Sequence, residues 1–241
     1  MNRIYAVGIG PGSENMMTAE CRRALSESDV IVGYPVYLGL LPEEFAGKKQ
    51  IGTPMRKEKE RCRMAISEAA GGRTVAVVSS GDAGVYGMAG LLYEMAAGSD
   101  TDIVVVPGIT AAVSGAAKLG SPLTNDFCVV SLSDALTPWE IIEKRLRAAA
   151  EGDFVLAIYN PQSRTRKDYI KKAAEILYKA GVEKDRPAGY VKNIGREGEE
   201  VFTGRLCEVA EADIDMFTTV FVGNSGTKLL QGKLVTPRGY K

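Results

Sequence analysis

The chain has 241 residues, of which 45% are hydrophobic and 25% charged, and its 30 basic residues balance 30 acidic ones. A formal net charge of zero gives no indication of a nucleic-acid or polyanion binder. The sequence contains no histidine, which excludes Ser–His and Cys–His nucleophile pairs and removes the commonest metal ligand.

The four cysteines are isolated in the sequence and form no C-x-x-C motif; they are Cys21, Cys62, Cys128 and Cys207. We therefore expect no cysteine-held metal or iron–sulfur cluster and no disulfide framework, and such usage is typical of the reducing cytoplasm. No apolar stretch is long enough to span a membrane, and residues 1–4 run directly into a strand-like segment. The sequence thus predicts a cytoplasmic protein with neither a membrane span nor a signal peptide.

The first half of the chain alternates strand-like and helix-like segments. Short apolar, β-branched runs predict strands over residues 4–7, 30–32, 75–78 and 103–106. Periodicity and composition predict helices over residues 14–26, 57–70 and 85–97. This alternation predicts an α/β fold with a largely parallel sheet.

The second half repeats this mixture of elements. Strands are predicted over residues 128–132, 154–159, 189–191 and 218–222. Thr137 is the expected N-cap of a helix over residues 138–150, and a second helix over residues 167–180 ends at Gly181. Residues 119–125 carry Gly and Pro and predict a link. We therefore expect two α/β domains, residues 1–118 and 119–241, with a ligand-binding cleft between them.

Three glycine-bearing loops follow predicted strands, over residues 8–12, 79–90 and 107–112. Glycine allows positive φ and lets a ligand approach the main chain. The carboxyl ends of strands are also where open α/β sheets bind ligands, and Asp82 supplies a carboxylate there. The alternative for each loop is a tight strand-to-helix turn that binds nothing.

The first of these loops departs from the dinucleotide-binding fingerprint. Position 13 is Ser where the third glycine is required, and the acidic residue Asp29 precedes the second strand instead of following it. The loop also lacks the lysine of a phosphate-binding loop. A nicotinamide or ATP site is therefore disfavoured.

Two basic segments have the composition of carboxylate-binding sites. Arg164 and Arg166 follow a predicted strand together with Ser163 and Thr165, and arginine binds carboxylates through paired hydrogen bonds. The alternative is a solvated helix entrance. Residues 236–240 end the chain with a compact composition, and we expect this tail, which includes Arg238, to dock over the cleft.

The three glycine loops have the order and spacing of those in the tetrapyrrole methylases, and the chain resembles that family. Within it, further segments resemble the branch that methylates precorrin-3B or cobalt-factor III at C-17; these are residues 32–34, 126–128, 131–134, 136–139, 142–145, 159–161, 222–224 and 236–240. The resemblance covers essentially the whole chain. It implies a homodimer of two-domain α/β subunits with S-adenosylmethionine folded between the domains.

The resemblance also implies a set of cofactor-binding positions: Pro11, Ser80, Asp82, Val85, Thr110, Ala111, Asn160 and Gly189. Ser80 stands where a glycine is common in the superfamily, and Asn160 where a methionine is common. Some members carry a cysteine-rich extension that holds an iron–sulfur cluster. Since the residues up to Lys241 contain no such group of cysteines, we expect no cluster.

The reaction that the resemblance implies is methylation of a polycarboxylate tetrapyrrole at C-17, coupled to ring contraction, in which carbon 20 leaves the ring but stays attached as an acyl group. This step requires proton handling at an oxygen substituent. Candidates by position are Ser131, Ser133, Asp134, Thr137 and Tyr159, and the expected carboxylate partners are Arg164, Arg166 and Arg238. Any cobalt is expected to arrive with the macrocycle.

Two alternatives remain beside this function. One is a sister methylase that acts at a different ring carbon, and the other is a non-catalytic cofactor-binding protein of the same fold. Asp82 and the Thr110-Ala111 pair favour a working site. The segments 133–134 and 137–139 favour the C-17 branch.

Overall fold

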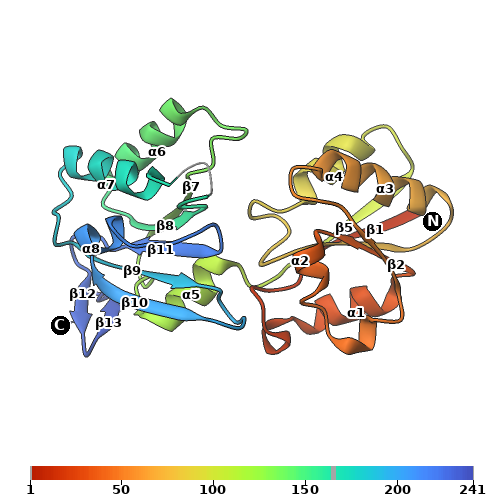
Figure 1. The fold of residues 1–241 in the computed structure, drawn as a ribbon, viewed down its shortest axis with the longest axis horizontal. Coiled ribbons are helices and arrows are strands. Elements are labelled where there is room, and N and C mark those ends of the chain that lie inside the picture. Colours follow the sequence, from red (N-terminus) through yellow and green to blue (C-terminus); the bar gives the residue numbers. More distant parts are fainter. Residues whose placement is uncertain (1, 164–166, 241) are drawn as a thin grey trace. The chain divides into compact units, whose positions relative to one another are not determined.

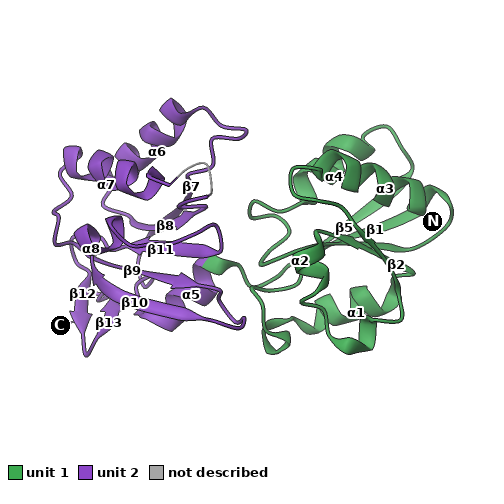
Figure 2. Ribbon diagram, viewed as in Figure 1, with its two compact units in different colours: residues 1–111 green, residues 112–241 purple. Residues whose placement is uncertain are grey.

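The computed structural model describes residues 2–163 and 167–240, which divide into two compact units, 1–111 and 112–241 (Figure 2). The division falls earlier than the expected boundary at 118/119 because helix α5 (Ala111–Leu119) packs in the second unit. A Cβ on Gly115 would lie 2.9 Å from the Phe221 ring in that unit. The expected link also contains strand β6 (Gly120–Ser121), which pairs with a later strand of the same unit.

Unit 1 is built on a five-stranded sheet in the order β3-β2-β4-β1-β5 over its described residues. The pairings are parallel, so all carboxyl ends lie along one edge. The strands are β1 (Asn2–Gly8), β2 (Val30–Gly33), β3 (Lys49–Gly52), β4 (Val75–Ser79) and β5 (Thr101–Val106). The four strands predicted in this half and the α/β fold class are confirmed.

Helices cover both faces of this sheet, with α1 on one side and α3 and α4 on the other (Figure 1). Strand β1 shows why: Ile4 and Ala6 join one buried cluster, whereas Tyr5 and Val7 join the opposite one. A strand buried on both faces has a continuous apolar sequence. The helices are α1 (Ala19–Glu27), α2 (Pro35–Leu38), α3 (Glu58–Ala70) and α4 (Ala89–Ala96), with 3-10 turns at Glu14–Met16 and Glu43–Phe45.

Two helices of unit 1 begin later than the sequence predicts. The segment predicted as a helix from residue 14 first forms the 3-10 turn, and α1 starts after Thr18, whose Oγ1 accepts a hydrogen bond from the Cys21 N–H at 3.0 Å. The helix predicted from residue 85 starts at Ala89, because Tyr86 has φ +54° and cannot continue a right-handed helix.

Unit 2 contains a mixed five-stranded sheet in the order β10-β9-β11-β8-β7 over its described residues. Only the β7–β8 pairing in this sheet is parallel. The strands are β7 (Phe127–Ser131), β8 (Val155–Tyr159), β9 (Pro187–Lys192), β10 (Glu200–Arg205) and β11 (Thr218–Val222). A smaller sheet joins β6 to the hairpin of β12 (Lys228–Leu230) and β13 (Lys233–Val235).

Besides α5, three helices of the described residues in unit 2 pack on one apolar cluster. They are α6 (Trp139–Glu151), α7 (Tyr169–Lys179) and α8 (Leu206–Ala210). Gly181, with φ +95°, follows the end of α7 as the sequence predicts. The prediction that Thr137 caps α6 is wrong: Pro138, at φ −54° and ψ 143°, is the N-cap, and no side chain caps the helix.

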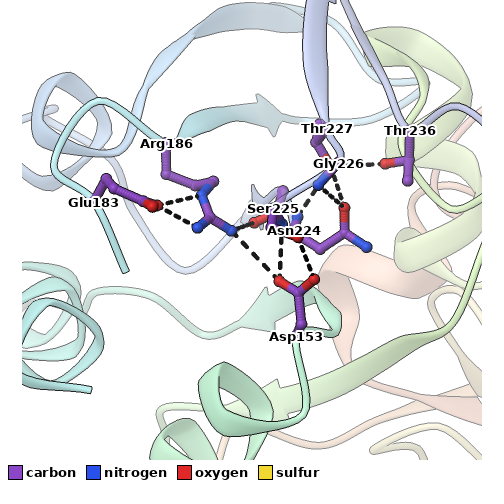
Figure 3. A network of polar contacts seen from close by, with 9 residues as sticks. Asp153, Glu183, Arg186, Asn224, Ser225, Gly226, Thr227 and Thr236 are labelled. Atoms are coloured by element: carbon purple, nitrogen blue, oxygen red, sulfur yellow. Dashed lines mark hydrogen bonds and ion pairs between the residues drawn. The ribbon is translucent and has the colours of Figure 1, made fainter. Parts of the chain in front are cut away.

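A polar network in unit 2 joins the turn before β8 to the loop after β11 (Figure 3). Asp153 accepts hydrogen bonds from the backbone and hydroxyl of Ser225, at 2.8 and 2.5 Å, and lies 3.6 Å from the Arg186 guanidinium. Burial alone would raise the pKa of Asp153, but the bonds from Ser225 and Arg186 lower it. Thr227 and the buried Thr236 share a hydroxyl bond at 2.8 Å, which anchors the start of the tail.

Candidate functional site

The loops after β1, β4 and β5 meet through their main chains at the carboxyl edge of unit 1. The Gly10 N–H donates to the Gly81 carbonyl at 3.0 Å, and the Gly81 N–H donates back at 2.7 Å. A Cβ on Gly108 would lie 2.1 Å from the Gly81 oxygen, and one on Gly8 would lie 2.7 Å from the Gly108 nitrogen. Glycine is required at these positions because no side chain fits between the loops.

Asp82 holds the same loops together from its side chain. Its Oδ1 accepts the N–H groups of Gly84 and Val85, at 2.7 and 3.2 Å, and its Oδ2 accepts the Gly108 N–H at 2.9 Å. The carboxylate therefore closes its own turn and fixes the loop after β5. The sequence predicts the position of Asp82 but gives no indication of this organising role.

The structure brings most of the predicted cofactor positions of unit 1 to this edge. Pro11 is buried, and the Ser80 hydroxyl donates to its carbonyl at 3.5 Å. Val85 lies in the turn closed by Asp82, and Thr110 and Ala111 lie at the start of α5. Small side chains and closely spaced main-chain groups suit a ligand that lies flat against the backbone, as S-adenosylmethionine would.

Sequence reasoning missed two residues that support this edge. Ser79, the last residue of β4, accepts the Met88 N–H on its hydroxyl at 3.2 Å and is 4% exposed. Met88 is the N-cap of α4 and is also buried. A serine that ends an apolar strand carries no sequence signal for such a bond.

A second group of predicted residues meets where β7 and β8 end in unit 2. Ser131 lies opposite Tyr159 in the parallel register. The Ser131 hydroxyl oxygen accepts the Asn160 Nδ2–H at 2.9 Å and the Ser133 N–H at 3.2 Å. Because both acceptor sites of that oxygen are used, the Ser131 O–H is oriented to donate. Asn160 has φ +52°, a conformation that asparagine tolerates better than most residues.

The Tyr159 hydroxyl accepts a hydrogen bond from a helix backbone, unlike the Ser131 hydroxyl. The donor is the Ala112 N–H, at 2.7 Å. Ala112 lies in the first turn of α5, where backbone N–H groups have no partner within the helix. The Tyr159 hydroxyl therefore supports the start of this helix.

Asp134 contacts the first residue of helix α7. Its Oδ2 accepts the Tyr169 hydroxyl at 2.6 Å, and the Tyr169 ring packs against Trp139 with the ring centroids 4.6 Å apart. Lys172 lies 5.1 Å above the same tyrosine ring. A hydrogen bond to Asp168 raises the pKa of Lys172, so its ammonium stays charged at neutral pH.

The remaining predicted residues lie elsewhere. Gly189 is in the interior of β9, paired on both sides, and a Cβ there would lie 2.5 Å from the Phe202 oxygen, which gives this glycine a packing reason. Thr137 directly precedes the N-cap of α6, and Arg238 is exposed in the tail. Arg164 and Arg166 lie outside the described residues.

A metal site and a membrane-spanning helix are both absent from the part of the chain that the structure describes. No group of three or more Cys, Asp or Glu side chains is arranged to hold a metal ion in residues 2–163 and 167–240. In the same residues, no helix is long and apolar enough to cross a membrane.

Comparison with known proteins identifies the family of the chain. Residues 3–210 match the family described as Tetrapyrrole (Corrin/Porphyrin) Methylases, and the chain belongs to this family. Tetrapyrrole methylases transfer a methyl group from S-adenosylmethionine, so the chain is an S-adenosylmethionine-dependent methyltransferase.

Several relatives are similar over almost their whole length. A protein of Salmonella typhimurium named probable cobalt-factor III C(17)-methyltransferase is 46% identical over 240 residues, covering 98% of this chain and 99% of that protein. A Sinorhizobium precorrin-3B C(17)-methyltransferase is 37% identical over 250 residues, covering 98% and 96%. The crystal structure of the methyltransferase CobJ superposes with a TM-score of 0.87 at 39% identity, covering 98% and 99%.

Other relatives are longer than this chain. The chain spans 53% of a cobalamin biosynthesis protein of Archaeoglobus fulgidus, to which it is 48% identical over 240 residues. It spans 45% of a cobalt-factor III methyltransferase of Priestia megaterium, to which it is 45% identical over 245 residues.

Proposed function

We propose that the chain methylates C-17 of cobalt-factor III or precorrin-3B, with S-adenosylmethionine as the donor, and contracts the ring in the same reaction, as a step of corrin biosynthesis. Family membership and the nearly full-length similarity to C(17)-methyltransferases support this function. The identity of 46% to the cobalt-factor III relative, against 37% to the precorrin-3B relative, favours the cobalt-bearing substrate.

The structural observation that carries the proposal is the carboxyl edge of unit 1, where Asp82 and three glycines join the loops. Bound S-adenosylmethionine supplies an electrophilic methyl group on a sulfonium. The proposed donor-binding residues of unit 1 are Pro11, Ser80, Asp82, Val85, Thr110 and Ala111. Asn160 and Gly189, in unit 2, stay predictions from the family resemblance. The task of these residues is positioning, an effect that contributes up to about 7–11 kcal/mol in well-oriented reactions.

Ser131 is the proposed contact to the oxygen substituent at which ring contraction occurs: its O–H donates a hydrogen bond that holds this oxygen while the acyl C=O forms and the oxygen's own proton is released to solvent. Two N–H groups occupy the acceptor positions of its oxygen, so the Ser131 O–H is left to donate a hydrogen bond. The two N–H groups also polarise the hydroxyl and make it a stronger donor. Ser133 and Asn160 thereby act as positioning residues. Tyr159 is a weaker candidate because its hydroxyl supports α5, while Asp134 and Thr137 remain candidates for proton handling.

The substrate carries acetate and propionate arms, for which Arg164, Arg166 and Arg238 are the proposed partners. A homodimer in the cytoplasm is the proposed working form, as the family resemblance implies. The competing functions are methylation at another ring carbon and binding without catalysis.

A single incubation tests the function against both. The protein is mixed with cobalt-factor III or precorrin-3B and methyl-labelled S-adenosylmethionine, and the product is examined by mass spectrometry and NMR. We expect a gain of one methylene unit in mass, the label at C-17 and an acyl group from carbon 20. Label at another carbon supports the sister methylase, and unchanged substrate with bound cofactor supports the non-catalytic protein.

A further inference from the structure

Arg61, on α3, is a buried cation in the interior of unit 1. Its side chain is only 4% exposed. Charged side chains are almost never fully buried unless they are paired. The hydrogen-bond partners of its guanidinium among the described residues are two carbonyl oxygens and one sulfur, and no carboxylate is among them.

These contacts leave the guanidinium incompletely satisfied. Its Nη2 donates to the Thr53 and Pro54 oxygens at 3.0 and 3.2 Å, and its Nη1 lies 3.6 Å from the Met88 Sδ. Its Nε has no partner in the described residues, and neither has the buried Thr53 Oγ1. Burial of a charge without a counter-charge opposes folding, so stability alone gives no reason for an arginine here.

The partners of Arg61 all lie beneath the loops at the carboxyl edge. Thr53 and Pro54 directly follow β3 and lead into α3. Met88 is the N-cap of α4, and its N–H donates to Ser79, the residue before Ser80. One guanidinium therefore joins the loop after β3 to the end of the glycine loop that contains Asp82.

We propose that Arg61 is a positioning residue for methyl-donor binding: it fixes both ends of the Ser80–Met88 loop from inside the unit, through Met88 and Ser79. The inference rests on the proposed donor site at this edge. Arg61 contacts neither donor nor substrate, so its effect is on the affinity for the donor and on KM, with little effect on the rate of the chemical step.

Arg61→Met separates positioning from stability. Methionine keeps a long, unbranched side chain and removes the buried charge, and such replacements are often neutral or stabilising. We expect unfolding at an unchanged or higher temperature, together with affinity for S-adenosylhomocysteine that is lower by about tenfold or more. KM for S-adenosylmethionine should rise by a similar factor while kcat stays within about twofold.

Three further variants complete the experiment. Arg61→Lys keeps the charge but not the fork of donors, and we expect an intermediate affinity, about threefold below wild type. Met88→Leu removes only the sulfur contact and should weaken binding by about threefold as well. Arg63→Met is the matched control, because Arg63 is exposed on the same helix, and its affinity should equal that of wild type.

Calorimetric titration with S-adenosylhomocysteine and thermal unfolding are measured for all five proteins. Weaker binding at unchanged stability in Arg61→Met, with partial rescue in Arg61→Lys, supports the inference. If Arg61→Met does not fold, the inference is tested with Arg61→Lys and Met88→Leu, and weaker binding of S-adenosylhomocysteine at unchanged stability in these two variants supports it. Wild-type affinity in the folded Arg61 and Met88 variants overturns the inference alone, whereas wild-type protein that binds no S-adenosylhomocysteine contradicts the proposed donor site.

Discussion

Asp82 illustrates how one side chain can serve both the fold and the site. Its two oxygens accept three backbone N–H groups from two different loops. A ligand at this edge is therefore bound by loops that the carboxylate has already arranged. The sequence shows a carboxylate at a strand end, but the partner loop is distant in the chain, so periodicity and spacing do not reveal the contact with Gly108.

Asp82→Ala should lower both stability and methyl transfer, with the larger effect on transfer. Loss of the acceptors should reduce the free energy of unfolding by about 1–3 kcal/mol, moderated by the partial exposure of this loop. Turnover per folded molecule should fall further, because the loop after β5 is released. Urea unfolding and transfer assays measure the two effects, and Asp82→Asn, which keeps one acceptor oxygen, should be intermediate. Wild-type turnover per folded molecule would mean that the carboxylate serves the fold alone.

Ser131→Ala tests the assignment of the hydrogen-bond donor to the substrate oxygen. The substitution removes the O–H but leaves Asn160 and Ser133 in place. We expect kcat for ring contraction to fall by about 10²–10³-fold, the usual cost of removing one hydrogen-bond donor to a reacting oxygen, with S-adenosylhomocysteine affinity unchanged. Single-turnover product analysis checks the result, with Tyr159→Phe as the comparison. A larger loss of contraction in Tyr159→Phe than in Ser131→Ala reverses the assignment.

The buried cysteines predict that the free energy of unfolding of the protein falls at alkaline pH. Burial raises the pKa of Cys21 to about 12 and that of Cys62 to about 11, from 9.0. A raised pKa in the folded state favours the thiol, so the unfolded state alone loses protons above pH 9 and the free energy of unfolding falls as pH rises towards 11.

Urea unfolding across this range measures the effect. The Cys21→Ala, Cys62→Ala double variant should show a flatter decline between pH 9 and pH 11 than wild type. Cys207→Ala is the control, because Cys207 is only partly buried. Parallel curves for the double variant and wild type would exclude the thiols as the source.

At the scale of elements, Gly108 in the loop after β5 and Gly90 in helix α4 differ in how much room they leave for a side chain. A Cβ on Gly108 meets the Gly81 oxygen at 2.1 Å, whereas a Cβ on Gly90 in α4 meets nothing within 4 Å. The two glycines belong to neighbouring segments of the same unit. They form a matched pair for mutation.

Gly108→Ala should therefore destabilise the unit, by about 1–3 kcal/mol or more as loops shift to admit the methyl group. Gly90→Ala should raise the free energy of unfolding by about 0.5–1 kcal/mol, because alanine has the higher helix propensity. Chemical denaturation of both variants gives the comparison. Equal free energies of unfolding for the two variants would mean that the loops move apart to admit the methyl group without loss of stability.

The sequence predicts a strand well where both faces of that strand are buried. Strands β1, β2 and β4 are buried on both faces and have continuous apolar sequences. Strand β3, mostly exposed at the sheet edge, and the hairpin β12–β13 lack such runs and are not predicted. Helix α8 is too short for periodicity to detect. The start of α4 fails because the local turn around Asp82 overrides helical composition.

For the whole molecule, the two-unit organisation follows from the alternation of elements, but the boundary depends on tertiary packing. Helix α5 is continuous in sequence with the loop after β5, yet Gly115 packs against Phe221, far along the chain. Only spatial contacts reveal that preference. The three glycine loops of the site are predicted from composition, whereas Arg61 lies in a charged helical segment whose sequence indicates exposure.

S-adenosylhomocysteine should bind the intact protein at one site per chain with micromolar affinity, about −8 kcal/mol. At a hundredfold excess over Kd, binding should stabilise the fold by about 2.7 kcal/mol, visible as a higher unfolding temperature. NADH is the control ligand, because the dinucleotide fingerprint is absent from residues 8–13. An absence of both heat and thermal shift with S-adenosylhomocysteine would exclude the donor assignment.

The main-chain contacts among Gly8, Gly81 and Gly108 also bear on how such an enzyme can diverge. Point mutations act on side chains, and at Gly8 and Gly108 no side chain fits between the loops. Selection for a new acceptor molecule must therefore act on other surfaces, while the geometry at this edge is inherited intact. Enzymes that share this unit can therefore evolve to methylate different acceptors while they keep the same methyl donor.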